Sequence, residues 1–320
     1  MLGSYAPLDN SRLRCHCGAV AFDKLEQLRA LLRSYGSCLI AYSGGVDSVF
    51  LARVASNVLG DKALAVIADS PSLPRRELDE ALAVARQFDF PVRVIRTNEF
   101  SNAEYTANPS NRCYFCKHEL FTELAPIARA GGFAVIAYGE NASDSGDYRP
   151  GAQAAAEFQV RAPLKEAGLT KSEIRALSER LGLPTADKPQ MACLSSRIPH
   201  GEAVTPEKLG MIERAEYVLR DLGFYDVRVR HHELPSAATS LNRSTVKPER
   251  FNDSTIQRFN GLTSLARIEV GPGELQKFLA DGVSARVAEA LKQIGYAHVT
   301  LDLQGYRRLN ADPAARTAAS

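Results

Sequence analysis

The 320-residue chain lacks tryptophan, and it has few cysteines and no long apolar run. Its longest apolar runs, such as 63–68, fall far short of the roughly 20 residues that a membrane-spanning helix needs. The start of the chain shows no apolar stretch typical of a secretory signal. Six cysteines are too few for a disulfide scaffold, so we expect thiols, metal ligands or catalytic groups. These absences predict a cytosolic protein without membrane contact.

Charge of one sign is not in excess either. The chain carries 39 basic and 37 acidic side chains, which give a formal net charge of +2. That balance offers no sequence-wide case for nucleic acid or an anionic membrane as a partner. With 45% hydrophobic and 24% charged residues, the composition is that of an ordinary globular protein. The length favours two domains or one large domain.

Short apolar runs alternate with helically spaced segments along the first two thirds of the chain. The runs predict strands at 38–42, 63–68, 92–96 and 133–137. The helical spacing predicts helices at 22–34, 49–59, 75–89, 116–130 and 171–181. This alternation indicates an α/β fold, a doubly wound parallel sheet with helices on both faces. Ligands of such sheets bind at the carboxyl ends of the strands.

The pattern changes after residue 201 and indicates a second, smaller α+β domain. Its elements are expected at 206–222, 227–231, 265–270, 273–294 and 298–303. Residues 233–264 are polar and without periodicity, so we expect a loop insertion there. The predicted organisation is an extension 1–19, an α/β domain 20–200, an α+β domain 201–309 with this insertion, and a tail 310–320.

A glycine-rich turn, SGGVDS at 43–48, joins the first strand to the next helix. Gly44 and Gly45 let the backbone approach a phosphate closely, and the following helix adds its positive end. Asp47 can reach a Mg²⁺ ion on the same phosphates, and Ser43 and Ser48 offer hydroxyls. The Walker pattern is absent. The turn resembles the pyrophosphate-binding loop of the N-type ATP pyrophosphatases, which implies transfer of AMP to an oxygen of the substrate.

Three cysteines stand in settings that favour chemistry. Cys113 and Cys116 lie three residues apart before a helix, and Cys193 lies in a loop near the end of the first domain. Three thiols could hold three irons of a [4Fe–4S] cluster and leave the fourth iron open. A zinc site would want a fourth ligand. Partly buried thiols without a function are the alternative.

Several stretches together resemble the LarE family of ATP-dependent sulfur-inserting enzymes. They are SGGVDS, NPSNRCYFCKHELF, YGENASDSGDYRPG, APLKEAGLTKSEIR, LGLPTADKPQMACLSSRIPHG, and VRVRHH followed later by ARIEV. The resemblance covers roughly 20–305, apart from the insertion, which departs from the family pattern. It implies that ATP adenylates each carboxylate of pyridinium-3,5-biscarboxylic acid mononucleotide and that sulfur then attacks.

The resemblance also implies the cofactors and the sulfur source. ATP and Mg²⁺ are expected, together with a [4Fe–4S] cluster on Cys113, Cys116 and Cys193, since family members with these three cysteines use such a cluster. In the other family variant a cysteine matching Cys193 gives up its own sulfur and becomes dehydroalanine. We favour the cluster, because Cys113 and Cys116 would have no task in the sacrificial scheme.

The resemblance to the LarE family also implies roles for single residues. The catalytic set is Cys193, Arg197 and Glu216. The ATP-binding set is Ser43, Gly44, Gly45, Asp47, Ser48, Asp69 and Asn141. Asp47 is expected on Mg²⁺, and Glu269 is expected as a further metal ligand. Arg228 and Arg230 alternate along one strand, so they share a face and suit a substrate phosphate, unless they are merely solvated.

Other functions fit parts of the sequence. A tRNA thiolation enzyme would combine the same loop with cluster cysteines, but the near-neutral charge argues against an RNA-binding face. An amidotransferase-type synthetase would leave the paired thiols idle. A nucleotide-binding iron–sulfur or zinc scaffold without catalysis is the non-enzymatic alternative. For the favoured function we expect a mononucleotide substrate, a sulfur donor that recharges the protein, and a homo-oligomer, a hexamer in this family.

Overall fold

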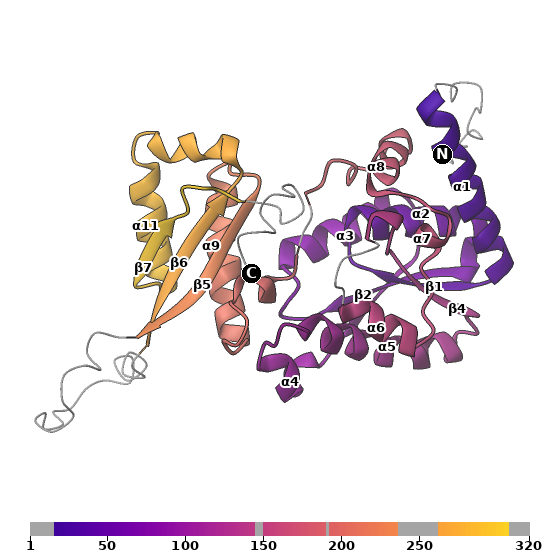
Figure 1. Ribbon diagram of the computed structural model, residues 1–320, viewed down its shortest axis with the longest axis horizontal. Helices are drawn as coiled ribbons and strands as arrows, with labels where there is room; N and C mark the ends of the chain where they lie inside the picture. Colours follow the sequence, from indigo (N-terminus) through magenta and orange to yellow (C-terminus); the bar gives the residue numbers. More distant parts are fainter. Residues whose placement is uncertain (1–15, 145–149, 190–191, 236–261, 307–320) are drawn as a thin grey trace, which may run out of the picture. The chain divides into compact units, whose positions relative to one another are not determined.

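The computed structural model describes residues 16–144, 150–189, 192–235 and 262–306 (Figure 1). The chain forms two compact units. The first unit comprises Met1–Asn102 and Asn111–Met191, and the second comprises Ala103–Ser110 and Ala192–Ser320. The predicted domain ranges, 20–200 and 201–309, stay predictions, because a compact unit and a domain need not share their limits. In the described parts of the chain, no helix is long and apolar enough to cross a bilayer.

The first unit is built on a four-stranded sheet with the order β3-β2-β1-β4, in which every neighbouring pair is parallel. The strands are β1 (Cys38–Tyr42), β2 (Ala63–Asp69), β3 (Val92–Arg96) and β4 (Val135–Tyr138). A parallel sheet with flanking helices confirms the predicted α/β fold. Because all strands run the same way, their carboxyl ends meet at one edge of the sheet.

Both faces of this sheet are covered, as the unbroken burial of β1 requires. Side chains alternate between the faces of a strand. Cys38, Ile40 and Tyr42 pack into one core with buried residues of α1 (His16–Tyr35), α2 (Val46–Leu59) and α3 (Arg75–Gln87). Leu39 and Ala41 pack into another with residues of α5 (Arg112–Ala130) and α6 (Pro150–Glu157). Figure 1 shows the two helical layers on opposite sides of the strands.

The helices of the first unit mostly begin earlier than the sequence predicts. They are α1 (His16–Tyr35), α2 (Val46–Leu59), α3 (Arg75–Gln87), α5 (Arg112–Ala130), α6 (Pro150–Glu157), α7 (Pro163–Glu166) and α8 (Lys171–Arg180). Neither α2 nor α5 has a side-chain hydrogen bond at its N-cap, although Asn111 before α5 is of a residue type that favours this position. Helix α8 has the predicted capping box between Thr170 and Glu173. The short helices α6 and α7 were missed.

The second unit holds a three-stranded mixed sheet with the order β5-β6-β7. Its elements are α4 (Ala103–Thr106), α9 (Pro206–Asp221), β5 (Val227–Pro235), β6 (Leu262–Val270), α11 (Val283–Ile294) and β7 (His298–Leu301). Strands β5 and β6 are antiparallel, and β6 and β7 are parallel. One face of the sheet packs on α9 and α11. The predicted small α+β unit is therefore present.

Two sequence predictions in this unit need correction. Strands β5 and β6 remain paired out to Pro235 and Leu262, so the ends of the range 233–264 are strand and not loop; residues 236–261 and the tail 310–320 lie outside the described residues. The helix predicted at 273–294 is divided into a 3₁₀ segment, Pro272–Leu279, and α11. Gly282, with a φ of 75°, separates the two, because its left-handed backbone interrupts a helix.

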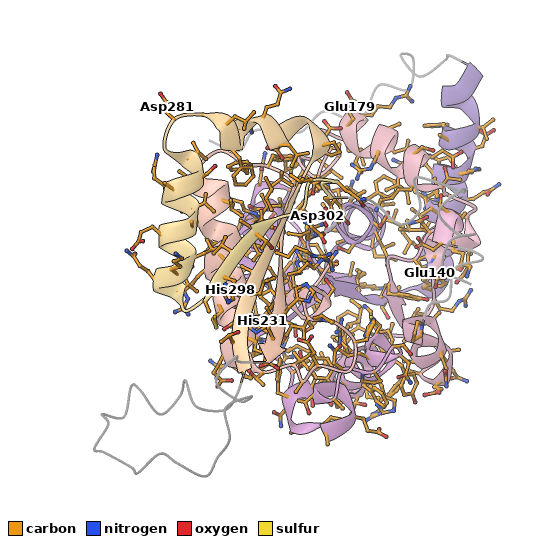
Figure 2. All side chains as sticks on the ribbon, turned by 60° about the vertical axis from the view of Figure 1, so that its left-hand side comes forward. Glu140, Glu179, His231, Asp281, His298 and Asp302 are labelled. Atoms are coloured by element: carbon orange, nitrogen blue, oxygen red, sulfur yellow. The ribbon has the colours of Figure 1, made fainter. Side chains whose placement is uncertain are left out.

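His231 packs in the core of the second unit. The His231 side chain, labelled in Figure 2, is 2% exposed, and its Nδ1 lies 3.3 Å from the Tyr296 hydroxyl. Burial, together with the positive charge of Lys208, lowers the pKa of His231 to about 4, although Glu233 opposes the shift. The neutral ring is therefore the form that the folded unit accepts.

We predict that acid destabilises the second unit through His231. The unfolded chain binds this proton below about pH 6.5 and the folded unit only near pH 4, so stability is complete above that interval and is lost as the pH falls through it. The loss approaches about 3 kcal/mol and is read from thermal unfolding at several pH values. His231→Phe should flatten this dependence, whereas Tyr296→Phe, which keeps the imidazole, should not. Equal pH profiles for wild type and His231→Phe would contradict the assignment.

Candidate functional site

The glycine-rich loop follows β1 at the carboxyl edge of the sheet, and close packing fixes its backbone. Gly44 has a φ of +70°, and a Cβ atom there would lie 2.6 Å from the Cβ of Ala81 in α3. A Cβ on Gly139, just after β4, would lie 3.0 Å from the Ser48 nitrogen in α2. Only glycine allows these approaches without displacement of a neighbour. The loop is therefore held between α3 and the end of β4.

Hydroxyl groups brace the same loop from within. The Ser43 N–H donates to Ser48 Oγ over 3.1 Å, and Ser48 Oγ donates to the Gly45 carbonyl over 3.1 Å. The two serine hydroxyls also lie 3.1 Å apart. Helix α2 begins directly after Gly45 and extends over 14 residues, so its positive end faces the loop. Backbone N–H groups at the start of a helix favour a negatively charged ligand, so this arrangement is the one that the predicted phosphate loop requires.

Asp47 lies in the first turn of α2 and contacts two other segments. Lys171 Nζ lies 2.5 Å from Asp47 Oδ2, and Asn141 Nδ2 donates to Asp47 Oδ1 over 3.5 Å. Burial raises the pKa of Asp47 and Lys171 opposes that rise. The sequence reasoning missed Lys171. The capping box located the start of α8, but no sequence signal says that this lysine reaches the loop.

The other predicted nucleotide residues lie at the same sheet edge. Asn141 follows β4, is 2% exposed, and accepts a hydrogen bond from the Ser143 N–H over 2.9 Å. Asp69 ends β2, and Arg75 at the start of α3 donates to its carboxylate. The structure thus brings six of the predicted residues together around the loop, with Asp69 on the adjacent strand. That they bind ATP stays a prediction.

The donor set around Asp47 suits Mg²⁺, which is usually held by one or two carboxylates together with substrate phosphates. The negative charge of Asp144 is close enough to raise the pKa of Asp47, so a second carboxylate is near. Among the residues that the structure describes, no group of three His, Cys, Asp or Glu side chains could hold a metal ion alone. Asp47 would therefore act as a ligand only beside phosphate oxygens.

The three predicted cluster cysteines belong to different units. Cys113 and Cys116 lie in the first turn of α5, where residues three apart share a face of the helix; Cys113 is exposed and Cys116 is half-buried. Cys193, also half-buried, lies in the second unit. The described cysteines form no disulfide. Three thiolates are the ligands that a [4Fe–4S] cluster with one open iron needs, but the described side chains include no group of three that could hold a metal ion as they lie, so the cluster stays a prediction.

In the second unit Cys193 lies in a turn, residues 192–197, that ends in a short 3₁₀ helix, Leu194–Arg197. The Arg197 side chain is fully buried, and its Nη1 donates to the Ala192 carbonyl over 2.7 Å and to the Cys193 carbonyl over 3.1 Å. Arg197 was expected to meet the substrate beside the sulfur. In this structure its guanidinium faces the backbone of the turn.

Glu216 of α9 is the counter-ion of Arg197. Its carboxylate accepts from Arg197 Nε over 2.8 Å and from Nη2 over 3.3 Å, and it also accepts from the Val229 N–H over 3.1 Å. Burial by itself lowers the pKa of Arg197, but the Glu216 carboxylate outweighs it and raises this pKa. Arg197 therefore keeps its positive charge inside the unit.

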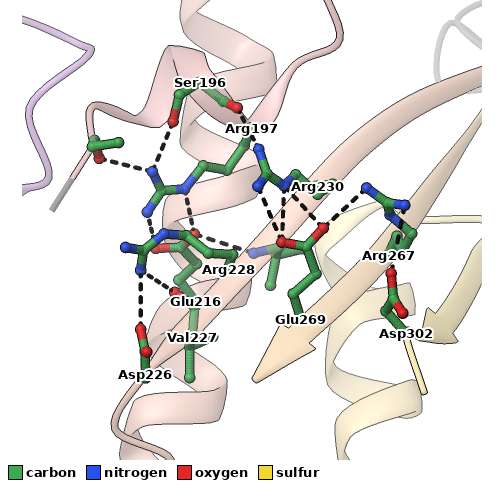
Figure 3. Close-up of polar contacts among 12 residues, drawn as sticks. Ser196, Arg197, Glu216, Asp226, Val227, Arg228, Arg230, Arg267, Glu269 and Asp302 are labelled. Atoms are coloured by element: carbon green, nitrogen blue, oxygen red, sulfur yellow. Dashed lines mark hydrogen bonds and ion pairs between the residues drawn. The ribbon is translucent and has the colours of Figure 1, made fainter. Parts of the chain in front are cut away.

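The two arginines of β5 point to the same face of the sheet, as predicted, but their surroundings differ (Figure 3). Arg228 is 2% exposed, donates to the Val227 carbonyl over 2.8 Å, and lies 4.7 Å from the centre of the Tyr306 ring. Arg230 is more exposed and donates to Glu269 over 3.1 Å. A role for either in binding substrate phosphate stays a prediction.

Glu269, the expected metal ligand, lies between two arginines. It accepts from Arg230 and, over 3.0 Å, from Arg267 Nη2, and Arg267 also faces Asp302 at 3.6 Å. These contacts satisfy the carboxylate without a metal ion. Its role as a ligand stays a prediction.

A glycine loop between a buried strand and a helix of a parallel sheet, with an acidic residue in the first helical turn, defines the class of PP-loop nucleotide-binding proteins. No family model matches the chain. The pyridinium-3,5-bisthiocarboxylic acid mononucleotide synthase of Lactiplantibacillus plantarum is 32% identical over 285 residues, which cover 89% of this chain and 92% of that protein. The chain therefore belongs to the LarE family of these synthases. The predicted resemblance and the prediction of an enzyme are confirmed.

Two further relatives place the family in context. An uncharacterised protein of Synechocystis is 43% identical over 284 residues, 89% of this chain and 95% of that protein. The glutamine-hydrolysing GMP synthase of Phenylobacterium zucineum is 27% identical over 230 residues, 60% of this chain and 41% of that protein. The weaker likeness to GMP synthase covers a smaller share of the chain than the likeness to the LarE family.

We predict that Lys171→Met weakens the binding of Mg-ATP. Loss of one hydrogen bond from a charged donor costs about 1.5–3 kcal/mol, so affinity should fall at least about tenfold in a calorimetric titration. The matched control is Lys24→Met, because Lys24 pairs with Glu173 of the same helix at 2.7 Å and is similarly buried. If both variants bind ATP as the wild type does, Lys171 has no part in the nucleotide site.

Proposed function

We propose that this enzyme uses ATP to insert sulfur into pyridinium-3,5-biscarboxylic acid mononucleotide, giving the bisthiocarboxylic acid mononucleotide that precedes the nickel-pincer nucleotide cofactor. The observation that carries the proposal is the 32% identity to a synthase of that product over 89% of the chain. This match includes both units, so it covers the residues of the glycine loop and of the Cys193 turn.

The first half of the proposed reaction activates a carboxylate. The carboxylate oxygen attacks the α-phosphorus of ATP, the bond to the β-phosphate oxygen breaks, and pyrophosphate leaves. The loop amides and the positive end of α2 bind the phosphates. Lys171, held by Asp47 before ATP arrives, turns its ammonium to the phosphates, and Asp47 then serves the Mg²⁺ ion. The preformed contacts of both groups support this exchange.

In the second half, sulfur delivered through Cys193 attacks the acyl carbon of the adenylate, the bond from that carbon to the phosphate oxygen of AMP breaks, and AMP leaves as the thiocarboxylate forms. Cys113, Cys116 and Cys193 would hold a [4Fe–4S] cluster, whose open iron would supply a transferable sulfide. The partial exposure of Cys193 and the position of Cys113 and Cys116 on one face of α5 support this assignment. The remaining partners are a sulfur donor that recharges the protein and further copies of the chain, assembled as a hexamer in the cytosol.

The proposed substrate is tested by the acceptor dependence of pyrophosphate release. The protein is incubated with Mg-ATP and either the pyridinium dicarboxylate mononucleotide, bulk tRNA or no acceptor. We expect release only with the mononucleotide, because its carboxylate is the nucleophile, and mass spectrometry should detect the thiocarboxylate. Release that requires tRNA would indicate an RNA thiolation enzyme. ATP binding without release in any arm would indicate a scaffold without catalysis.

The proposed sulfur source is tested with Cys113→Ala. Anaerobic reconstitution of the wild type should give about four irons per chain, and Cys113→Ala should lose both iron and turnover, since one of three ligands is gone. Cys38→Ala is the control, because Cys38 is fully buried in β1. Undiminished turnover by Cys113→Ala, or loss of hydrogen sulfide from Cys193 of the wild type after turnover, would contradict the cluster.

A further inference from the structure

The backbone of the Cys193 turn is held by two guanidinium groups that come from different sides. Arg197 Nη1 donates to the carbonyls of Ala192 and Cys193, over 2.7 and 3.1 Å. Arg230 Nη1, from β5, donates to the Ser196 carbonyl over 2.7 Å. Figure 3 shows both side chains directed at the turn. The carbonyls before and after the sulfur-bearing residue are thus both fixed.

A glutamate aims each guanidinium. Glu216 accepts from Arg197 at 2.8 Å and is itself anchored by the Val229 N–H of β5. Glu269 of β6 accepts from Arg230 at 3.1 Å. Both arginine–glutamate pairs therefore connect the turn to neighbouring strands of one sheet.

Ser196 joins the two halves of this arrangement. Its hydroxyl donates to the Cys193 carbonyl over 2.7 Å and accepts from Arg197 Nη1 over 2.9 Å. Its own carbonyl is the acceptor for Arg230. One serine therefore links both guanidinium groups to the backbone of the cysteine.

Hydrogen bonds of Asn108 and Tyr105 fix the 3₁₀ helix and the chain that follows the turn. Asn108 is fully buried, and its Nδ2 donates to the carbonyls of Pro199 and Glu202 over 2.7 and 3.0 Å. The hydroxyl of Tyr105 lies 2.9 Å from Ser195 Oγ. All these residues belong to the second unit. The turn is thus constrained on both sides of Cys193.

We propose that Arg197 and Arg230 are positioning residues of sulfur transfer, which hold the backbone of this turn so that the Cys193 thiolate, as a ligand of the proposed cluster, stays in one place. The proposal rests on the proposed function and assigns these two arginines a different role from contact with substrate. A buried ion pair contributes little more to stability than apolar side chains of similar volume. Arginine adds a planar guanidinium group whose N–H donors point in fixed directions, and these donors hydrogen-bond to the carbonyls of the turn.

Positioning acts on one step only. A sulfur nucleophile must lie close to, and in line with, the acyl carbon, and misplacement by about 1 Å can cost about a hundredfold in rate. Adenylation uses the groups of the first unit and does not depend on the turn. A defect confined to the transfer step is therefore the signature of a positioning role.

The test compares the full-length wild type with Arg197→Lys and Arg230→Lys. We expect pyrophosphate release with the mononucleotide to keep its rate and KM within about twofold. Thiocarboxylate formation should fall about ten- to a hundredfold in kcat, because lysine retains the charge but not the fork. In the iron-free protein, where no cluster occupies the thiol, alkylation of Cys193 by iodoacetamide should not slow at any pH, because this small reagent needs no fixed geometry.

A matched control and a milder variant complete the design. Glu274→Gln is the control, since Glu274 also accepts backbone N–H groups in the second unit, from Tyr225 and Asp226, but does not contact the turn. It should transfer sulfur as the wild type does. Ser196→Ala removes one link and no buried charge, so it keeps the proposal testable if Arg197→Lys fails to fold, and it should also lower only the transfer kcat.

Several outcomes would overturn the proposal. A raised KM for the mononucleotide with unchanged transfer kcat would mean contact with substrate, and slower alkylation with a shifted pH profile would mean activation of the thiol. If the wild type releases no pyrophosphate, the proposed function fails, but hydrogen exchange of the Ser196 amide still tests whether Arg230 holds the backbone of the turn. Faster exchange in Arg230→Lys supports this role of Arg230, and unchanged exchange refutes it.

Discussion

Close approach of backbone to backbone at the end of the parallel sheet is the constraint on which the first unit depends. Gly44 lies so near to Ala81, and Gly139 so near to the Ser48 nitrogen, that a methyl group at either position would displace a neighbouring element. The start of α2, the flank of α3 and the end of β4 are therefore held together. Because interiors are close-packed and transmit strain, the loop keeps one shape before any phosphate arrives. That preorganisation reduces the entropic cost of binding.

Each unit contains an ion pair at its proposed site, and the degree of burial decides how easily the pair can be broken. Lys171 and Asp47 form a pair that is partly exposed, with side chains 33% and 20% accessible, whereas Arg197 and Glu216 are almost completely buried. A half-exposed pair is weak and can exchange partners when phosphates compete. A buried pair is costly to break, since removal of one partner leaves an uncompensated charge. The first arrangement suits a site that rearranges on binding, and the second suits a site that must stay fixed.

Much of the fold could be predicted because periodicity and turn signals are local. Strands β1 and β3 were predicted with their observed limits, and the capping box marked the start of α8. The apolar spacing failed at the start of α5, which begins at Arg112 and not at 116, and where Gly282 interrupted an apolar pattern that continued beyond it. Contacts between distant segments leave no local trace. The reach of Lys171 to Asp47, and the burial of Arg197 against Glu216 and the turn, became visible only in three dimensions.

The division of the chain into two units gives the proposed chemistry a physical logic. Adenylation needs a site that tolerates a polyanion and a metal ion. The glycine-rich loop, the positive end of α2 and the Lys171–Asp47 ion pair, which can exchange partners, meet these demands. Sulfur transfer needs a nucleophile held against a reactive anhydride, which water would otherwise hydrolyse. The two demands conflict within a single site, because one requires mobile charges and the other requires fixed ones. Placing the loop in one unit and the Cys193 turn in the other lets each be built without compromise.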